Sequence, residues 1–258
     1  MKNGIQPPQP FEPELIPIPA GEFLMGSDPE QDAQAAGDEQ PQHKLYLPDY
    51  YMARTPVTNA QYLPFVQATF RQPSGWKAGR PPAAQEEHPV VTVTWEDAVA
   101  YSRWLAETTG KPYRLPSEPE WEKAARGPEG RIYPWGNAWD EKRCNSLEGG
   151  KGGTSPVGMY SPAGDSPYGC ADMARNVWEW TRSLWGDEWP EPDFKYPYHP
   201  DDGRENLKAR GGVMRVLRGG SFDYSLKLVR CAFRNRMVPK PRQVYSNFGF
   251  RVCLAAGG

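Results

Sequence analysis

Two carboxylates and an amide fall close together between Asp172 and Glu179, with Asn176 separating the acids. Calcium takes about six to eight oxygen ligands, and short loops can add backbone carbonyls to carboxylate and amide oxygens. The alternative is a tight turn that packs Trp178 and Trp180 under the core, with Glu179 in a salt bridge. Composition alone favours the turn, and a metal site is the competing hypothesis.

The segment from Arg215 to Cys253 could do a second kind of chemistry, namely binding. Gly219 and Gly249 mark its two ends, while Pro239 and Pro241 between them exclude a helix and a continuous strand. Apolar residues nevertheless recur in this interval, at Tyr224, Leu226, Leu228, Val238, Val244 and Tyr245. The pattern indicates an irregular, partly apolar surface that is carried by a rigid scaffold.

Arginines of the same segment could clamp an anion, or they could hold loops together by bonding carbonyls and carboxylates. They include Arg218, Arg230, Arg234, Arg236, Arg242 and Arg251. We expect the second role, which is the more common one. Nucleophilic catalysis has little support, because no Ser or Cys lies in a nucleophile elbow. Three histidines and four cysteines without CxxC spacing give no zinc-type cluster.

Three capping sequences predict the helices that must support these segments. Thr58 with Gln61 begins a helix that Pro64 shortens or kinks, whereas Thr94 and Ser117 begin two well-formed helices. The expected ranges of the latter two are 95–107 and 118–126. Strands are expected within 16–26 and 44–53, and at 177–181, 215–218 and 248–254, with long loops after residue 131.

Composition narrows the class of protein. The 258 residues carry 30 basic and 32 acidic side chains, a balance that does not favour nucleic acid or an anionic membrane as partner. Ten Trp and 13 Tyr argue against disorder despite 29 Pro and 26 Gly. No long apolar run and no signal-peptide core are found, so we expect a cytoplasmic protein without membrane insertion. We expect a Pro-rich leader at 1–15 and a single domain at 16–258.

Several motifs together resemble the formylglycine-generating enzyme (sulfatase-modifying factor) superfamily over about residues 14–255. They are IPAGEFLMGS, TPVTNAQYLPFV, HPVVTVTWEDAVAYSRWLAETTGKPYRLPSEPEWEKAARG, YPWGN, SPYGCADMARNVWEWT, RVLRGGSF and SNFGFRV. The resemblance implies an α+β, C-type lectin-like fold, loop-rich, with few helices and short antiparallel strands.

Catalytic members of that family use a cysteine pair to bind copper and oxidise a substrate cysteine. The matching positions here are Tyr224 and Leu226, which cannot bind copper, so we expect no copper and no formylglycine reaction. Cys231 falls outside both positions and is not counted as a reactive thiol. Related sulfoxide synthases take histidine ligands largely from a separate helical domain, which this chain lacks.

The resemblance also implies calcium. One family site corresponds to Asp172, Met173, Arg175, Val177 and Glu179, with the middle three acting through backbone carbonyls. Family members usually have Gly at position 175 and often Asn at 172. The other family site would begin at Asn145, but its expected Asp is replaced by Gly149, so we expect one structural calcium.

Variable proteins of diversity-generating retroelements share this fold and place hypervariable residues between an RGGS-like start and a GFRV-like end. Our first hypothesis is therefore a non-catalytic module that binds a protein or small ligand. Its surface would comprise Phe222, Asp223, Tyr224, Leu226, Phe233, Met237, Val238, Val244 and Tyr245. The alternative is a metal-dependent oxidoreductase of the formylglycine-generating enzyme or sulfoxide synthase type.

Overall fold

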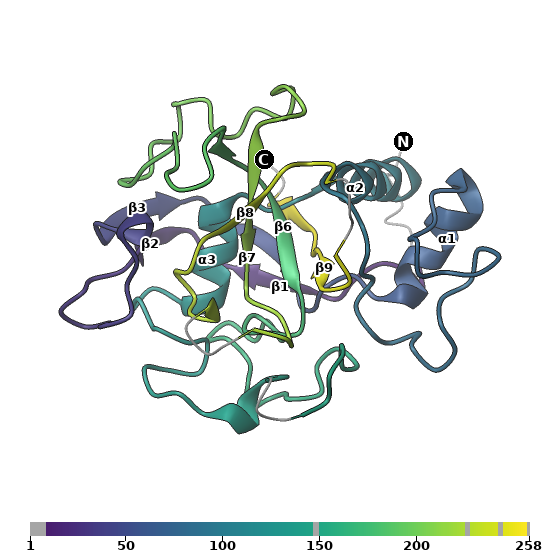
Figure 1. Cartoon of the computed structure of the whole chain (residues 1–258), viewed down its shortest axis with the longest axis horizontal. Helices are drawn as coiled ribbons and strands as arrows, with labels where there is room; N and C mark the ends of the chain where they lie inside the picture. Colours follow the sequence, from purple (N-terminus) through teal and green to yellow (C-terminus); the bar gives the residue numbers. More distant parts are fainter. Residues whose placement is uncertain (1–8, 147–149, 225–227, 242–244, 257–258) are drawn as a thin grey trace, which may run out of the picture.

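A computed structural model describes residues 9–146, 150–224, 228–241 and 245–256. This part of the chain contains three α-helices and ten short strands among long loops (Figure 1). The helices are α1 (Asn59–Thr69), α2 (Trp95–Thr109) and α3 (Glu118–Arg126), with 3-10 helices at Gly37–Glu39 and Glu141–Arg143. None of the helices in the described ranges is long and apolar enough to cross a membrane.

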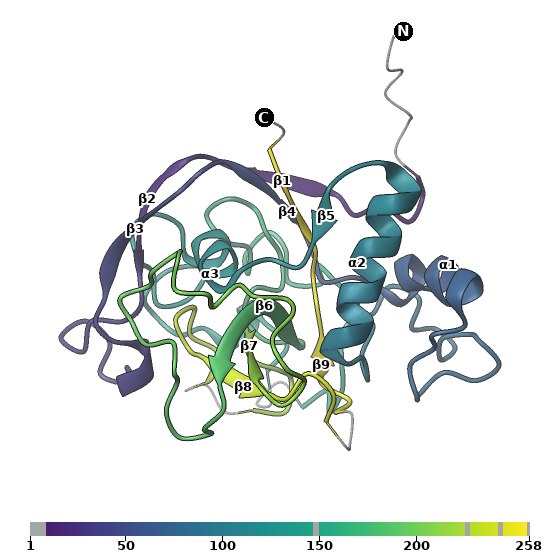
Figure 2. The same ribbon diagram turned by 90° about the horizontal axis from the view of Figure 1, so that it is seen from above.

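The strands form three sheets. The first has the order β1 (Leu15–Ile18), β4 (Tyr50–Ala53), β10 (Cys253–Ala255), β5 (Tyr113–Arg114), and β2 (Gly21–Met25) pairs with β3 (His43–Leu47). The third has the order β8 (Asn235–Met237), β7 (Met214–Arg218), β6 (Trp178–Gly186), β9 (Phe248–Gly249). In Figure 2, α1 and α2 lie to one side of the third sheet and the β2–β3 pair to the other.

Local sequence signals place the helices correctly. Thr58, Thr94 and Ser117 each cap their helix as predicted. In all three the cap side chain accepts the backbone N–H three residues on, and the cap's own backbone N–H donates to the side chain of that residue. Pro64 lies inside α1, which is 11 residues long. Gly127 ends α3 with a positive φ of 71°.

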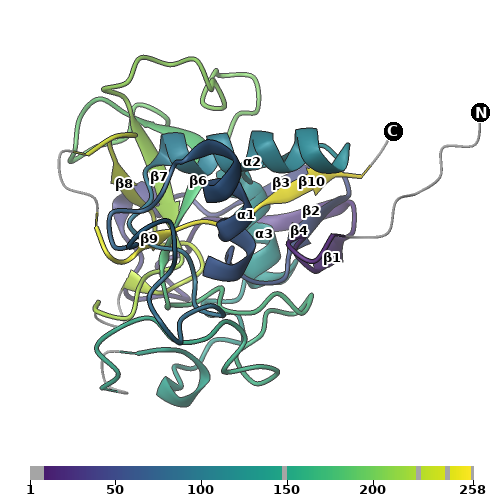
Figure 3. The ribbon, with the colours of Figure 1, turned by 90° about the vertical axis from the view of Figure 1, so that its right-hand side faces the viewer.

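The prediction of one strand over residues 248–254 is wrong. β9 pairs in parallel with β6, whereas β10 pairs with β4 and β5 in a different sheet. The chain therefore crosses between sheets at residues 250–252, where the completely buried Arg251 reaches Glu179. Loops between α3 and β6 lie below the third sheet in Figures 1 and 3.

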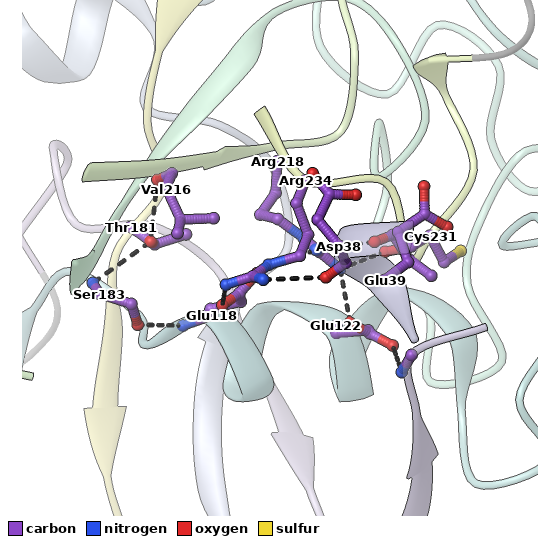
Figure 4. A network of polar contacts seen from close by, with 12 residues as sticks. Asp38, Glu39, Glu118, Glu122, Thr181, Ser183, Val216, Arg218, Cys231 and Arg234 are labelled. Atoms are coloured by element: carbon purple, nitrogen blue, oxygen red, sulfur yellow. Dashed lines mark hydrogen bonds and ion pairs between the residues drawn. The ribbon is translucent and has the colours of Figure 1, made fainter. Parts of the chain in front are cut away.

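Every residue of α3 is buried, including its three glutamates. Glu118 accepts hydrogen bonds from Arg218 (3.1 Å) and Arg234 (2.7 Å). Glu122 accepts from Arg218 (2.6 Å) and from Arg126 (2.7 Å), so the two carboxylates and the arginines form one network (Figure 4). Burial raises the pKa of Glu118, but Arg234 and Arg218 outweigh it and hold that pKa below its usual range.

Two further arginines, Arg230 and Arg251, also pair with buried carboxylates. Arg230 donates to Asp32 (2.7 Å) and Glu39 (2.6 Å), which attaches the loop after β2 to the C-terminal segment. Arg251 donates to both carboxylate oxygens of Glu179. The expectation that these arginines hold the structure together is confirmed for Arg218, Arg230, Arg234 and Arg251.

Replacing Glu118 with Gln should lower the free energy of unfolding by about 3–5 kcal/mol, because a buried guanidinium loses its compensating charge. Urea unfolding followed by far-UV circular dichroism measures the change. The control is Glu191→Gln, which breaks the exposed pair with Lys195 (2.8 Å) and should leave the midpoint unchanged. Equal midpoints for the two variants would show that the network contributes nothing specific.

Candidate functional site

A cavity of about 320 Å³ lies where the C-terminal segment crosses the sheet of β6 to β9. We call it the aromatic cavity. Its described lining is Trp178, Trp189, Tyr224, Leu228, Phe233, Asn235, Met237, Tyr245 and Phe248. Four of the residues predicted to bind a ligand, Tyr224, Phe233, Met237 and Tyr245, are thus brought together by the fold.

Aromatic contacts fix the wall of this cavity. The ring centroid of Trp178 lies 5.7 Å from that of Tyr224, edge to face, and 5.8 Å from that of Phe233. Tyr245 packs at 5.0 Å on Phe248. Trp178 is completely buried, whereas the Tyr224, Tyr245 and Trp189 side chains are 37%, 40% and 51% exposed. The cavity therefore has a buried aromatic floor and a solvent-facing aromatic rim.

One polar group in this wall is unsatisfied. The indole Nε1–H of Trp178 has no hydrogen-bond partner within the described part of the chain. Buried N–H groups are almost always paired, because an unpaired one costs about 1–3 kcal/mol. This nitrogen is itself buried, so the unpaired donor belongs to the floor beneath the cavity and not to its open surface.

The other predicted binding residues occupy different places. Asp223 accepts hydrogen bonds from Ser221 Oγ (2.6 Å) and Asn247 Nδ2 (2.9 Å), and so fixes the turn that presents Tyr224. Phe222 is half-buried outside the lining, and Val238 packs against Trp185 in a separate apolar cluster. Leu226 and Val244, like Arg242, lie outside the described residues.

Two glycines show why the frame around this surface is constrained. Gly220 has a φ of 77°, and a Cβ there would lie 2.6 Å from Cγ1 of Val229. A Cβ on Gly249 would lie 2.7 Å from the carbonyl oxygen of Val90. Neither position can accept a side chain without movement of its surroundings, so both ends of the segment are held in place.

Sequence reasoning missed part of the lining. The sequence does not predict Trp189 as part of the lining, because it lies in an acidic loop of a kind that is usually exposed to solvent. A tryptophan in such a loop is the one signal that could have identified it. The sequence predicts Trp178 only as a core residue, and nothing local indicates that Asn235 faces the same space.

The loop of residues 172–179 has the geometry of a tight turn with a buried ion pair. Glu179 binds Arg251 through both oxygens, and its Oε2 also accepts from Trp121 Nε1 (2.8 Å). Arg175 has a φ of 65°, a conformation that glycine adopts without strain. Met173 and Val177 are buried in the core.

Asp172 is the residue of this loop that best fits a cation. Its carboxylate accepts one hydrogen bond, from Gly158 N–H (2.7 Å), and burial raises its pKa to about 6. A bound calcium ion would share Glu179 with Arg251 and would take its remaining ligands from carbonyls. No group of three or more His, Cys, Asp or Glu side chains among the described residues is placed to hold a metal. Calcium at this loop stays a prediction.

Residues 3–256 match the family described as the sulfatase-modifying factor enzyme 1-like domain. The chain belongs to this family. The formylglycine-generating enzyme of Mus musculus is 30% identical, over 94% of this chain and 75% of its own length. The hercynine oxygenase of Mycolicibacterium smegmatis is 32% identical over 89% of this chain. The serine/threonine-protein kinase pkn1 of Chlamydia pneumoniae is 33% identical over 95% of it. This chain spans 59% of that oxygenase and 38% of that kinase.

Solved structures confirm the fold of this family member. PvdO from Pseudomonas aeruginosa superimposes with a TM-score of 0.74 at 25% identity, over 96% of both chains. Treponema denticola variable protein 1 gives a TM-score of 0.72 at 22% identity, over 94% of this chain and 95% of its own. The expected α+β, C-type lectin-like fold of the formylglycine-generating enzyme type is thereby confirmed.

The family match gives the aromatic cavity a further meaning. Tyr224, which the resemblance places at the first copper-binding cysteine position of catalytic members, lies in the cavity wall. The second position, Leu226, is not described. Cys231 is completely buried, and burial raises its pKa to about 12, which makes a reactive thiolate there unfavourable.

Adding calcium to chelator-treated protein should raise the melting temperature, because a ligand that binds only the native state stabilises it. The gain is about 2.7 kcal/mol at a hundredfold excess over the Kd. Asp172→Asn should abolish this difference, whereas the control Asp187→Asn, in the exposed ion pair with Arg210, should retain it. Identical unfolding curves with calcium and with chelator would exclude the site.

Proposed function

We propose that this member of the sulfatase-modifying factor family is a binding module that takes an apolar or aromatic group of a protein or small ligand into the aromatic cavity. The observation that carries the proposal is the convergence of Tyr224, Phe233, Met237 and Tyr245 on one space. Its volume of about 320 Å³ falls at the lower end of the usual range for ligand sites, about 300–1,000 Å³.

The chemistry of the cavity supports an aromatic ligand with a hydrogen-bond acceptor. Aromatic rims give large contact area with few rotatable bonds, so little entropy is lost on binding. Asn235 adds an amide group to a wall that is otherwise mainly aromatic and apolar. Tyr224 replaces the thiol that copper chemistry in this family requires, which favours recognition over catalysis.

A role as a variable protein of a diversity-generating retroelement makes a further prediction, which concerns the gene. A template repeat and a reverse-transcriptase gene should lie beside it, with differences between the repeats confined to codons of the segment between Ser221 and Gly249. Codons of the frame, such as those for Gly220 and Gly249, should be identical in both repeats. A gene without such a repeat would restrict the proposal to a fixed ligand.

A second candidate function is a metal-dependent oxidoreductase, which the identity to the formylglycine-generating enzyme of Mus musculus favours. Metal analysis of purified protein and oxygen uptake with a cysteine-containing peptide distinguish the two. Stoichiometric copper or iron together with peptide-dependent oxygen uptake would replace the binding proposal with this one.

Binding of 4-fluorophenol, followed by ¹⁹F NMR, tests the aromatic cavity. Its ring suits the aromatic wall of the cavity. The double variant Tyr224→Ala/Tyr245→Ala should weaken binding about tenfold, since each aromatic contact contributes about 0.5–1.5 kcal/mol. The control Tyr46→Ala/Tyr51→Ala removes two rings that are 62% and 38% exposed on β3 and β4.

Both double variants should remain folded. Unfolding of the Tyr224→Ala/Tyr245→Ala protein at ordinary temperature would mean that these rings are core rather than binding surface. Equal affinity of both double variants for the probe would show that the cavity does not bind it.

A further inference from the structure

A second cavity, of about 550 Å³, lies on the other side of β8. We call it the polar cavity. Three distant parts of the chain form it: residues 36–40, residues 190–196, and Phe233 with Arg236. Phe233 also lines the aromatic cavity. Side chains alternate along a strand, so Arg236 faces away from Asn235 and Met237, which line the aromatic cavity.

The walls of the polar cavity are fastened together by one buried side chain. Arg234 donates to the backbone carbonyls of Asp38 (2.9 Å) and Phe194 (3.3 Å), which belong to the two opposing loops. The same guanidinium binds Glu118 in the network of α3. The cavity is therefore a built part of the fold rather than a gap between mobile loops.

Arg236 is held in place, but its terminal nitrogens have few partners in the described part of the chain. Its guanidinium lies over the rings of Trp185 (4.3 Å) and Trp189 (5.1 Å), and its Nε donates to Trp189 O (2.9 Å). Within the described part of the chain its terminal nitrogens make no hydrogen bond. Their one ion pair, with Asp38 Oδ2, is 3.7 Å long, although both side chains are only 16% exposed.

Two neighbouring groups share this lack of partners. The Asp38 carboxylate receives no side-chain or backbone donor from another described residue beyond that long contact. The hydroxyl of Tyr196, a cavity residue that is 7% exposed, also has no partner among the described residues. Burial raises the pKa of Asp38 and lowers the pKa of Arg236, as expected when desolvation is poorly compensated.

We propose that the polar cavity binds a small zwitterion of the α-amino acid type, with the ammonium group on Asp38 and the carboxylate on Arg236. A ligand with both charges can pair with Asp38 and with Arg236 at once, whose contact with each other is long. A ligand with one charge would leave the opposite residue facing a like charge. Arg236 is suited to the carboxylate because a planar guanidinium can donate two parallel hydrogen bonds. Tyr196 and Phe233 offer apolar and aromatic surface to the ligand side chain.

Three probes that share a phenyl ring test the contributions of the ammonium group and of the carboxylate separately. L-Phenylalanine carries both, 3-phenylpropanoate lacks the ammonium group, and 2-phenylethylamine lacks the carboxylate. Isothermal titration calorimetry should show L-phenylalanine binding at least about tenfold more tightly than either analogue, as expected when a charged hydrogen-bond pair is lost. Comparable affinities for all three, or for L-phenylalanine and 3-phenylpropanoate, would overturn the proposal.

Variants test the two residues separately. Asp38→Asn and Arg236→Gln should each weaken L-phenylalanine binding about tenfold or more. Asp38→Asn is the safer variant, because Arg234 binds the Asp38 backbone carbonyl and not its side chain. The control Arg210→Gln breaks the exposed pair with Asp187 in the neighbouring loop and should change nothing. Unaltered binding by folded Asp38→Asn protein would refute the assignment.

The aromatic-cavity variant separates this inference from the proposed function. Tyr224→Ala/Tyr245→Ala protein should bind L-phenylalanine as the unmodified chain does, because neither tyrosine lines the polar cavity. A parallel loss of phenylalanine and 4-fluorophenol binding in that variant would place both probes in the aromatic cavity and overturn the second site.

Discussion

The fold depends on neutralising the carboxylates of a helix that has no access to water. Glu118 and Glu122 of α3 are completely buried, and an unpaired buried carboxylate would cost several kcal/mol. Arg218 from β7 and Arg234, next to β8, supply the compensating charges (Figure 4). This requirement ties a helix in the middle of the chain to strands about a hundred residues further on. The positions of Arg218 and Arg234 beside α3 therefore fix the path of the C-terminal segment.

The positions of both cavities depend on these buried ion pairs. Because Arg234 must reach Glu118, its remaining donors fix the loops that wall the polar cavity. The next side chains along β8 then alternate, so that Arg236 faces the polar cavity and Met237 the aromatic one. The buried charges hold the frame rigid, while the side chains between its fixed points are left to face solvent or ligand.

Family membership and chemistry point in different directions here. The chain is 30% identical to a formylglycine-generating enzyme over most of its length, yet the resemblance places Tyr224 where catalytic members have the first copper-binding cysteine. In the structure Tyr224 lies in an aromatic wall, and this placement is the basis of the proposed binding role. One scaffold can support both roles, because the arginine–glutamate network that maintains the fold lies beneath the site and does not contribute to its surface.

Features that depend on neighbours along the chain can be predicted from the amino-acid sequence. Capping boxes at Thr58, Thr94 and Ser117 specify helix starts within a single turn, and Tyr224 and Tyr245 stand out as apolar residues in an irregular segment. The sheet arrangement and the second cavity depend instead on contacts between residues far apart in the chain. The break between β9 and β10 arises because Arg251 pairs with Glu179, 72 residues away, and Asp38 meets Arg236 across most of the chain. Such long-range pairings leave no local pattern, since desolvation selects the partner only after the chain has folded.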